Sequence, residues 1–258
     1  MAPKSSKWVC TDTHLVEQRA GDRMAVAAGV IGTAILFVMS RGPRSLVTRV
    51  TAEDGFIETL SAVFYLMGCV ICASRLWTSR GQPKALLVLW MFLCFLFFAE
   101  EISWFQRLFD YPTPELVRSF NAQGELNLHN LTFWSGTSPY RALETKEYDL
   151  RLLTSSATIF KVGFFTYFLA LPLILRAGWG RRLTDWQAFP TVRASFLLSL
   201  CSTMLVSFAL ALCSREPTTK SIVETREMLY AVFIALYVWT YLTATGNAPR
   251  LREGRATR

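Results

Sequence analysis

Two adjacent carboxylates, Glu100 and Glu101, end a long apolar segment and are the side chains in this sequence best placed to do chemistry. The residues before them, 85–98, are typical of a helix that faces hydrocarbon. Charges at membrane depth are costly and normally face a protein interior or a water-filled cavity. A carboxylate in such a place can act as a general acid or base. We therefore expect a polar site here, with Glu100, Glu101 and His129 as its catalytic residues.

Helical spacing separates the two carboxylates. Glu100, Trp104 and Arg107 share one helix face because they are four and three residues apart, whereas Glu101 lies about 100° away. One interpretation is an ion pair between a glutamate and Arg107, or a cation of a neighbouring helix, which would only fix helix packing. The neighbouring cations are Lys161 and Arg226. The other interpretation is a site in which Arg107 holds an anionic headgroup.

An amide-rich stretch, 121–130, holds the second group of candidates. Glu125 and His129 are four residues apart, so a helical turn would place them on one face. With Glu100 or Glu101 they supply one imidazole and two carboxylates, which can bind a divalent metal and leave one position open. The spacing matches no established metal motif, so the cofactor stays undetermined. The alternative is that His129 is a structural residue, hydrogen-bonded among the surrounding amides.

The composition is that of a multi-pass membrane protein. Hydrophobic residues make up 52% and charged residues 18% of the 258 residues, and the charges gather between long apolar runs. We expect an all-α, polytopic transmembrane bundle of about six spans within residues 24–244. The expected spans are 24–40, 56–77, 85–109, 158–175, 194–213 and 222–243. The net charge of +8 lies mostly between spans, where it sets orientation, so we expect no nucleic-acid partner.

The third span is unusually short in apolar residues. About 15 of them separate Lys84 from Glu100, or roughly 22 Å of helix against a hydrocarbon core of roughly 30 Å. If Lys84 lies at one interface, both glutamates lie inside the other boundary. We therefore expect the helix to continue through Trp104 to Phe109 and complete the crossing.

The long connection 110–157 is expected to lie outside the cytoplasm and to contain a short interfacial helix. Thr113 would be its N-cap and Pro114 its first residue. Residues 1–23 would form a cytoplasmic N-terminal segment and 245–258 a basic cytoplasmic tail, because Lys and Arg are richer in the short connections on that side.

This orientation brings the ionisable residues of the spans to one level near the outer leaflet. Glu58, Lys161 and Glu227 lie where their spans begin, and Glu100 and Glu101 lie where theirs ends. We expect a substrate to bind at this level. The expected binding residues are Arg107, Gln106, Trp104, Glu58, Asn127 and Asn130.

Three stretches of the sequence together resemble the pattern of a known protein family. They are Glu53-Asp54-Gly55-x-x-Glu58, Glu100-Glu101-Ile102-Ser103-Trp104-x-Gln106-Arg107 and Asn121-x-Gln123-x-Glu125-x-Asn127-Leu128-His129-Asn130. With them the chain resembles a family of uncharacterised bacterial multi-pass membrane proteins, mainly over residues 53–131. The family pattern usually has Gly where Phe105 stands, and a bulky ring there denies the close backbone approach that Gly allows. The resemblance implies no activity, only that the three stretches occur together.

Two classes of function fit these features. The first is a membrane enzyme that acts on a lipid or lipid-linked substrate at the outer leaflet, with Glu100 or Glu101 as acid or base. In that enzyme Glu125 and His129 would be a second base or metal ligands. The alternative is a non-catalytic subunit of a membrane complex, or a small transporter. We expect membrane lipid and other membrane subunits as partners, and a bacterial inner (plasma) membrane as the location.

Overall fold

The computed structural model describes residues 6–52, 55–78, 84–121, 124–128, 131, 155–176 and 192–242, without the side chains of 6–17, 107, 175 and 176. This part of the chain is helical, with one isolated bridge between Asn121 and Leu131. The long elements are α1 (Ser6–Arg41), α3 (Phe56–Thr78), α4 (Lys84–Glu101), α12 (Ala194–Leu212) and α13 (Thr218–Tyr237). The shorter ones are α2 (Arg44–Val50), α5 (Gln106–Phe109), α6 (Glu115–Phe120), α9 (Ser156–Phe165), η1 (Thr166–Ala170), α10 (Leu171–Arg176) and η2 (Val238–Leu242).

Four segments are long and apolar enough to cross a membrane. They are Gln18–Arg41, Phe56–Thr78, Ser156–Ile174 and Ala194–Leu212. The prediction of an all-α fold is confirmed for the described residues, and these four segments are candidate membrane spans, against about six predicted. Large apolar side chains point outward from these segments, for example Val30 and Leu205, as expected where lipid replaces water. The helices α4 and α13 have similar lengths and carry three and four charged residues.

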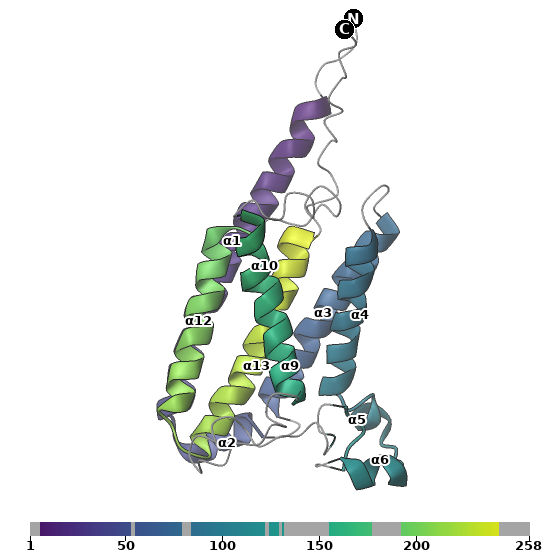
Figure 1. Ribbon diagram of the computed structural model, residues 1–258, viewed down its shortest axis with the longest axis vertical. Helices are drawn as coiled ribbons and strands as arrows, with labels where there is room; N and C mark the ends of the chain where they lie inside the picture. The colour runs from purple at the N-terminus through teal and green to yellow at the C-terminus, as the bar shows by residue number, and fades with distance from the viewer. Residues whose placement is uncertain are drawn as a thin grey trace, which may run out of the picture.

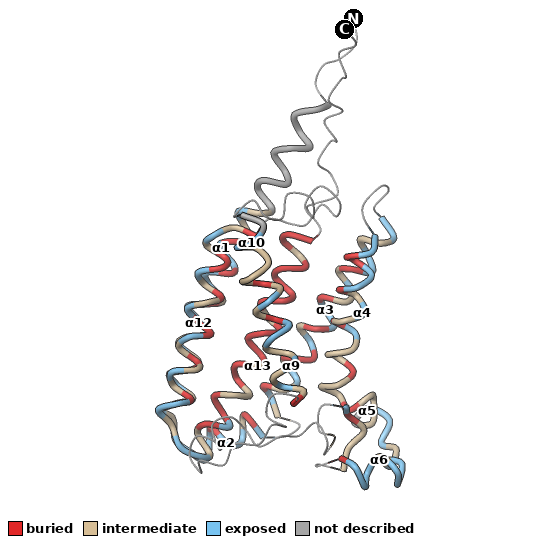
Figure 2. Tube along the Cα trace, viewed as in Figure 1, coloured by how far each residue is buried: buried red, intermediate tan, exposed pale blue. Residues whose placement is uncertain are grey.

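The helix α13 is the centre of the bundle. It packs against α1, α3 and α12, and α4 packs on the outer side of α3 (Figure 1). Most residues of α13 are buried, and Figure 2 shows it as the most continuously buried helix. The two ends of the described chain, the start of α1 and the end of η2, lie at the same end of the bundle (Figure 1).

Small and hydroxyl-bearing residues bring α1 close to its neighbours. Ser199 Oγ donates to the carbonyl of Ala25 at 2.7 Å, and Thr203 Oγ1 donates to that of Gly29 at 3.3 Å. A Cβ added at Gly29 would lie 2.1 Å from Ser199 Oγ, and one at Gly21 would lie 2.7 Å from the Cβ of Thr240. Such contacts through small residues are the usual way that membrane helices associate.

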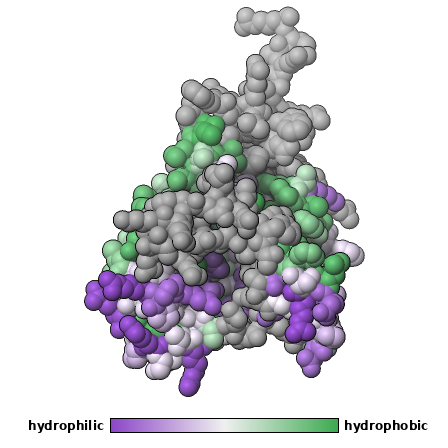
Figure 3. Space-filling view, turned by 60° about the horizontal axis from the view of Figure 1, so that its bottom comes forward, coloured by the Kyte–Doolittle hydropathy of each residue, from purple (hydrophilic) through white to green (hydrophobic). Residues whose placement is uncertain are grey.

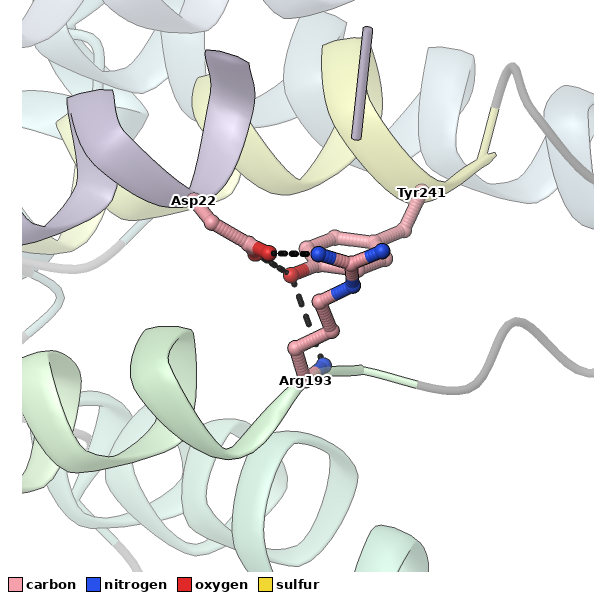
Figure 4. A network of polar contacts seen from close by, with 3 residues as sticks. All are labelled: Asp22, Arg193 and Tyr241. Atoms are coloured by element: carbon pink, nitrogen blue, oxygen red, sulfur yellow. Dashed lines mark hydrogen bonds and ion pairs between the residues drawn. The ribbon is translucent and has the colours of Figure 1, made fainter. Parts of the chain in front are cut away.

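A polar clamp joins three elements at the end of the bundle where α1 enters it (Figure 4). The carboxylate of Asp22 on α1 accepts a hydrogen bond from the hydroxyl of Tyr241 on η2. Its other oxygen lies 3.1 Å from Nη1 of Arg193, the residue before α12. The backbone N–H of Arg193 also donates to the Tyr241 hydroxyl at 3.4 Å. The clamp therefore fixes α1, α12 and η2 to one another.

Two turns of π-helix, η1 and η2, interrupt the helical geometry within the bundle. Beside them, Trp90 Nε1 donates to the hydroxyl of Tyr167 at 3.0 Å, and this hydroxyl lies 2.6 Å from that of Tyr237. These three residues come from α4, η1 and α13. The chain of hydrogen bonds lets polar side chains sit among aromatic rings without an unsatisfied group.

The opposite end of the bundle differs from the sequence prediction in two ways. The helix expected to run to Phe109 is broken, because α4 ends at Glu101 and α5 begins only at Gln106. A short helix, α6, is present where the sequence predicted an interfacial one, but it begins at Glu115 with Pro114 as its N-cap. Thr113 does not cap it. Instead, its hydroxyl accepts a hydrogen bond from Gln106, which is why the capping pattern failed.

Candidate functional site

The break after α4 is a left-handed turn. Ser103, Trp104 and Phe105 have φ angles of 48°, 51° and 69°, a region that costs non-glycine residues energy. The backbone N–H of Trp104 donates to the carbonyl of Ala99 at 2.6 Å and so closes the end of α4. The ring of Phe105 packs against that of Phe98, with centroids 5.9 Å apart. Three consecutive strained residues persist only where surrounding contacts hold them.

Glu100 supplies one of these contacts. Its Oε1 accepts a hydrogen bond from the indole Nε1 of Trp104 at 2.5 Å, and its Oε2 accepts from the backbone N–H of Leu128 at 2.7 Å. The hydroxyl of Tyr111 donates to the carbonyl of Trp104 from the other side. Glu100 therefore joins the end of α4 to a connection almost thirty residues further along the chain. Each of its oxygens is already used by the protein.

A second carboxylate has the same kind of role. Glu125 Oε2 accepts hydrogen bonds from Ser103 Oγ at 2.6 Å and from Asn127 Nδ2 at 3.1 Å. Gln106 adds two more bonds, because its Oε1 accepts from the backbone N–H of Leu126 at 3.0 Å and its Nε2 donates to Thr113 at 2.7 Å. The polar residues of 100–106 and 121–128 thus form a network that shapes this end of the molecule.

A pocket of about 350 Å³ lies next to this network, between α3, α4, α9 and α13. We call it the polar pocket. Its polar lining consists of Tyr65, Glu100, Glu101, Ser156, Lys161, Glu227 and Tyr230. Hydrophilic residues gather around this end of the molecule, and hydrophobic surface lies on the flanks beyond it (Figure 3). The polar pocket therefore lies near the level at which a membrane boundary would cross the helices.

The charges of the polar pocket come from different helices. Glu101 ends α4, Lys161 lies one turn into α9, and Glu227 lies in the first half of α13. Glu101 and Glu227 are both within electrostatic range of Tyr65, and Glu227 is within electrostatic range of Lys161. With Glu100, the pocket thus brings three carboxylates and one ammonium together from three helices.

A second cavity, of about 400 Å³, adjoins the polar pocket and is almost wholly apolar. We call it the apolar slot. The two cavities share Phe97, Ser156 and Phe160 as lining residues, and the slot extends along α9 past Gly163 to Trp90 and Tyr167. A side chain at Gly163 would point into open space, since no atom lies within 4 Å of a Cβ built there. Both volumes are in the range of ligand-binding sites.

A buried cation stands beside the polar pocket. Arg226 on α13 is fully buried, and its guanidinium lies 4.4 Å from the centroid of the Phe208 ring on α12. It is within electrostatic range of Lys161. A cation–π contact of this kind offsets part of the cost of burying the charge. Arg226 therefore adds positive potential behind the pocket without lining it.

The structure places the sequence-predicted site residues in two groups. Glu100 and Glu101 line the polar pocket, whereas Glu125 faces the network. The predicted binding residues Trp104, Gln106 and Asn127 also belong to the network. Glu58 lies half-buried in the first turn of α3 and is not among the described residues that line the pocket. The residues that lie outside the described structure are His129, Asn130 and the side chain of Arg107.

The metal-site prediction rested on a helical turn that would align Glu125 with His129. The described residues 124–128 are not helical. Within the described part of the chain, no three His, Cys, Asp or Glu side chains come together as a metal site would require. Because His129 lies outside the described residues, a metal at this place stays a prediction.

Five polar pocket residues were not among the predicted site residues: Tyr65, Ser156, Lys161, Glu227 and Tyr230. The sequence did carry a signal for two of them, because Lys161 and Glu227 are charges near the starts of apolar segments. Nothing in the sequence distinguishes Tyr65 and Tyr230 from other tyrosines of the bundle.

Comparison of the chain with known protein families, with curated proteins and with solved structures finds no match. A function must therefore follow from the geometry of the site.

Proposed function

We propose that this protein is a membrane enzyme that acts on a lipid or lipid-linked substrate. The observation that carries the proposal is the junction of the polar pocket with the apolar slot at one end of a helix bundle. An amphipathic molecule has the same division into a polar and an apolar part. The substrate's chain would lie in the slot, and its headgroup would lie among Glu101, Lys161 and Glu227.

We assign the roles from the hydrogen bonds of Glu100 and from the positions of the other charged residues in the pocket. Glu100 is occupied by Trp104 and Leu128, so we assign it a positioning role. We assign Glu101 and Glu227 as acid and base, because both line the pocket from different helices. Lys161 would hold an anionic oxygen of the substrate, as a compact cation does. Arg107 and His129, which the sequence favours, remain proposed participants from the adjoining turn and connection.

The experiment is turnover of lipid by the full chain in vesicles that contain a total bacterial lipid extract, followed by mass spectrometry. We expect Glu101→Gln and Glu227→Gln each to reduce turnover at least tenfold while the folded yield stays unchanged. Glu115→Gln is the matched control, because Glu115 is exposed on α6. If no lipid changes in the presence of the unaltered protein, or if turnover falls only in proportion to folded yield, the proposal is wrong.

A non-catalytic subunit of a membrane complex is the second candidate. The observation in its favour is that Glu100 and Glu125 both have structural hydrogen bonds. Such a subunit would bind a lipid in the same cavities without changing it, which the turnover experiment detects. A proton or ion transporter is disfavoured, because the halves of the spans that we expect on the cytoplasmic side hold few charged residues.

We further propose that the protein belongs with the bacterial multi-pass family that it resembles, crosses the inner membrane about six times and keeps both termini in the cytoplasm. The hydrogen bonds between 100–106 and 121–128 support a shared role for two of the resembling stretches. In the third stretch, residues 53 and 54 lie outside the described structure.

A further inference from the structure

The charge pattern of the polar pocket limits the headgroup that it can accept. The pocket is lined by three carboxylates, Glu100, Glu101 and Glu227, and by one ammonium, Lys161. A polyanionic headgroup would meet three like charges and only one opposite charge. A headgroup with one phosphate and one ammonium would meet an opposite charge for each of its own.

We infer that the preferred ligand is a zwitterionic aminophospholipid. Its phosphate would pair with Lys161, with Arg226 adding positive potential from behind. Its ammonium would donate hydrogen bonds to Glu101 and Glu227. This inference rests on the proposed function, because it names the substrate class for the same two cavities.

The apolar slot accounts for the rest of the molecule. Its 400 Å³ has room for roughly a dozen groups the size of a water molecule or a methylene. This matches a large part of one acyl chain. The slot adjoins the polar pocket at Phe97, Ser156 and Phe160, so that one ligand can occupy both cavities.

The test is competition among three lipid probes for the purified full chain in detergent, measured by native mass spectrometry. The probes share acyl chains and differ in headgroup: phosphatidylethanolamine has an ammonium with N–H donors, phosphatidylcholine has a cation without them, and phosphatidylglycerol has no cation. We expect phosphatidylethanolamine to bind at least tenfold more tightly than phosphatidylglycerol and several-fold more tightly than phosphatidylcholine. Equal binding of all three, or a preference for phosphatidylglycerol, overturns the inference.

Variants connect this preference to the residues. The double substitution Glu101→Gln with Glu227→Gln should remove the preference for phosphatidylethanolamine while lipid binding itself persists. Lys161→Met should weaken all three phospholipids by a similar factor. A preference that survives the double substitution overturns the assignment of the ammonium to these carboxylates. Thermal unfolding in the same detergent identifies any variant that is not folded, and Glu101→Asp then serves in its place, with an expected partial loss of preference.

One variant separates the failure of this inference from that of the proposed function. A Cβ at Gly163 would have no atom within 4 Å, so Gly163→Leu should place its side chain in the apolar slot and reduce binding of every probe at least tenfold. Val162→Leu, on the exposed face of the same helix, is the matched control. If Gly163→Leu has no effect on binding, the cavities are not a lipid site and the proposed function fails. If it blocks binding but headgroups do not differ, only the inference fails.

Discussion

Glu100 is a charged residue at the end of an apolar helix. Two hydrogen bonds fix the position of its carboxylate. One comes from Trp104, four residues on, and one from the backbone of Leu128. Both oxygens of the carboxylate must accept, and only an ionised carboxylate can do this on both sides. The charge is therefore part of the architecture of the turn.

Replacing Glu100 by Gln should destabilise the protein. The amide group would have to present its NH₂ to one of two donors, which leaves a buried or half-buried group without its partner. We expect a loss of about 1–3 kcal/mol in the free energy of unfolding, measured by titration with a denaturing detergent. The same substitution at exposed Glu115 should have no measurable effect. Equal stability of the two variants would contradict the structural role of Glu100.

Phe105 occupies a backbone conformation that favours glycine, with φ of 69°. The energetic consequence can be isolated by comparing two variants that both lose the ring. Phe105→Gly should be more stable than Phe105→Ala by about 1 kcal/mol, because only the alanine keeps the left-handed penalty of a Cβ. The unfolding free energies of the pair measure this difference. Alanine that is as stable as glycine would show that the turn is not strained at this residue.

At the scale of elements, the close packing of α1 against its neighbours depends on glycine residues, which have no side chain to fill the contact. A Cβ at Gly21 would lie 2.0 Å from Thr240 Oγ1 and 2.7 Å from its Cβ, so η2 would have to move. At Gly163 a Cβ would meet nothing. The same substitution therefore has opposite consequences on two helices.

We expect Gly21→Ala to lower the unfolding free energy by about 1–3 kcal/mol, as overpacking does. Gly163→Ala should raise it by about 0.5–1 kcal/mol, because alanine favours the helix. The two variants have the same change in composition, and measuring them side by side in one detergent removes general effects of the mutation. If both variants lowered the unfolding free energy, helix propensity and local packing would not explain the effect of these substitutions.

The sequence was sufficient to predict α3 and α12 to within a few residues, whereas α1 begins at Ser6, well before the predicted span 24–40. The apolar run 194–213 predicted α12, and 56–77 predicted α3, because length and hydrophobicity alone decide these elements. The end of α4 was not predictable, since residues 101–109 contain neither Gly nor Pro. The left-handed turn there depends on hydrogen bonds from residues far along the chain. The pocket residues depend on how spans pack, which hydrophobicity does not encode.

At the scale of the whole molecule, the two ends of the bundle differ in chemistry. One end has the clamp of Asp22, Arg193 and Tyr241, and the other has the polar pocket and its network. Between them the long helices are apolar. Because the polar pocket lies at only one end of the bundle, the orientation of the protein in the membrane decides which leaflet the pocket faces.

Cys213 reports this orientation, because it is exposed just after α12, at the end of the bundle that holds α2 (Figure 1). We expect a membrane-impermeant maleimide to label it on intact cells, since the proposed topology places this end outside the cytoplasm. Cys213→Ser should abolish the label. Labelling of Cys213 only after the membrane is permeabilised would reverse the proposed orientation.

Aromatic rings bridge α9 to its neighbours beside the cavities. The ring centroids of Phe97 and Phe160 are 5.3 Å apart, and those of Phe160 and Tyr230 are 5.2 Å apart. Rotation of a ring about its side-chain bonds is far faster and less costly than displacement of a helix. A hydrophobic ligand that diffuses in the plane of the bilayer could thus enter the cavities between the helices without dissolving in water. Its rate of arrival would then depend on its mole fraction among the surrounding lipids, and not on its aqueous concentration.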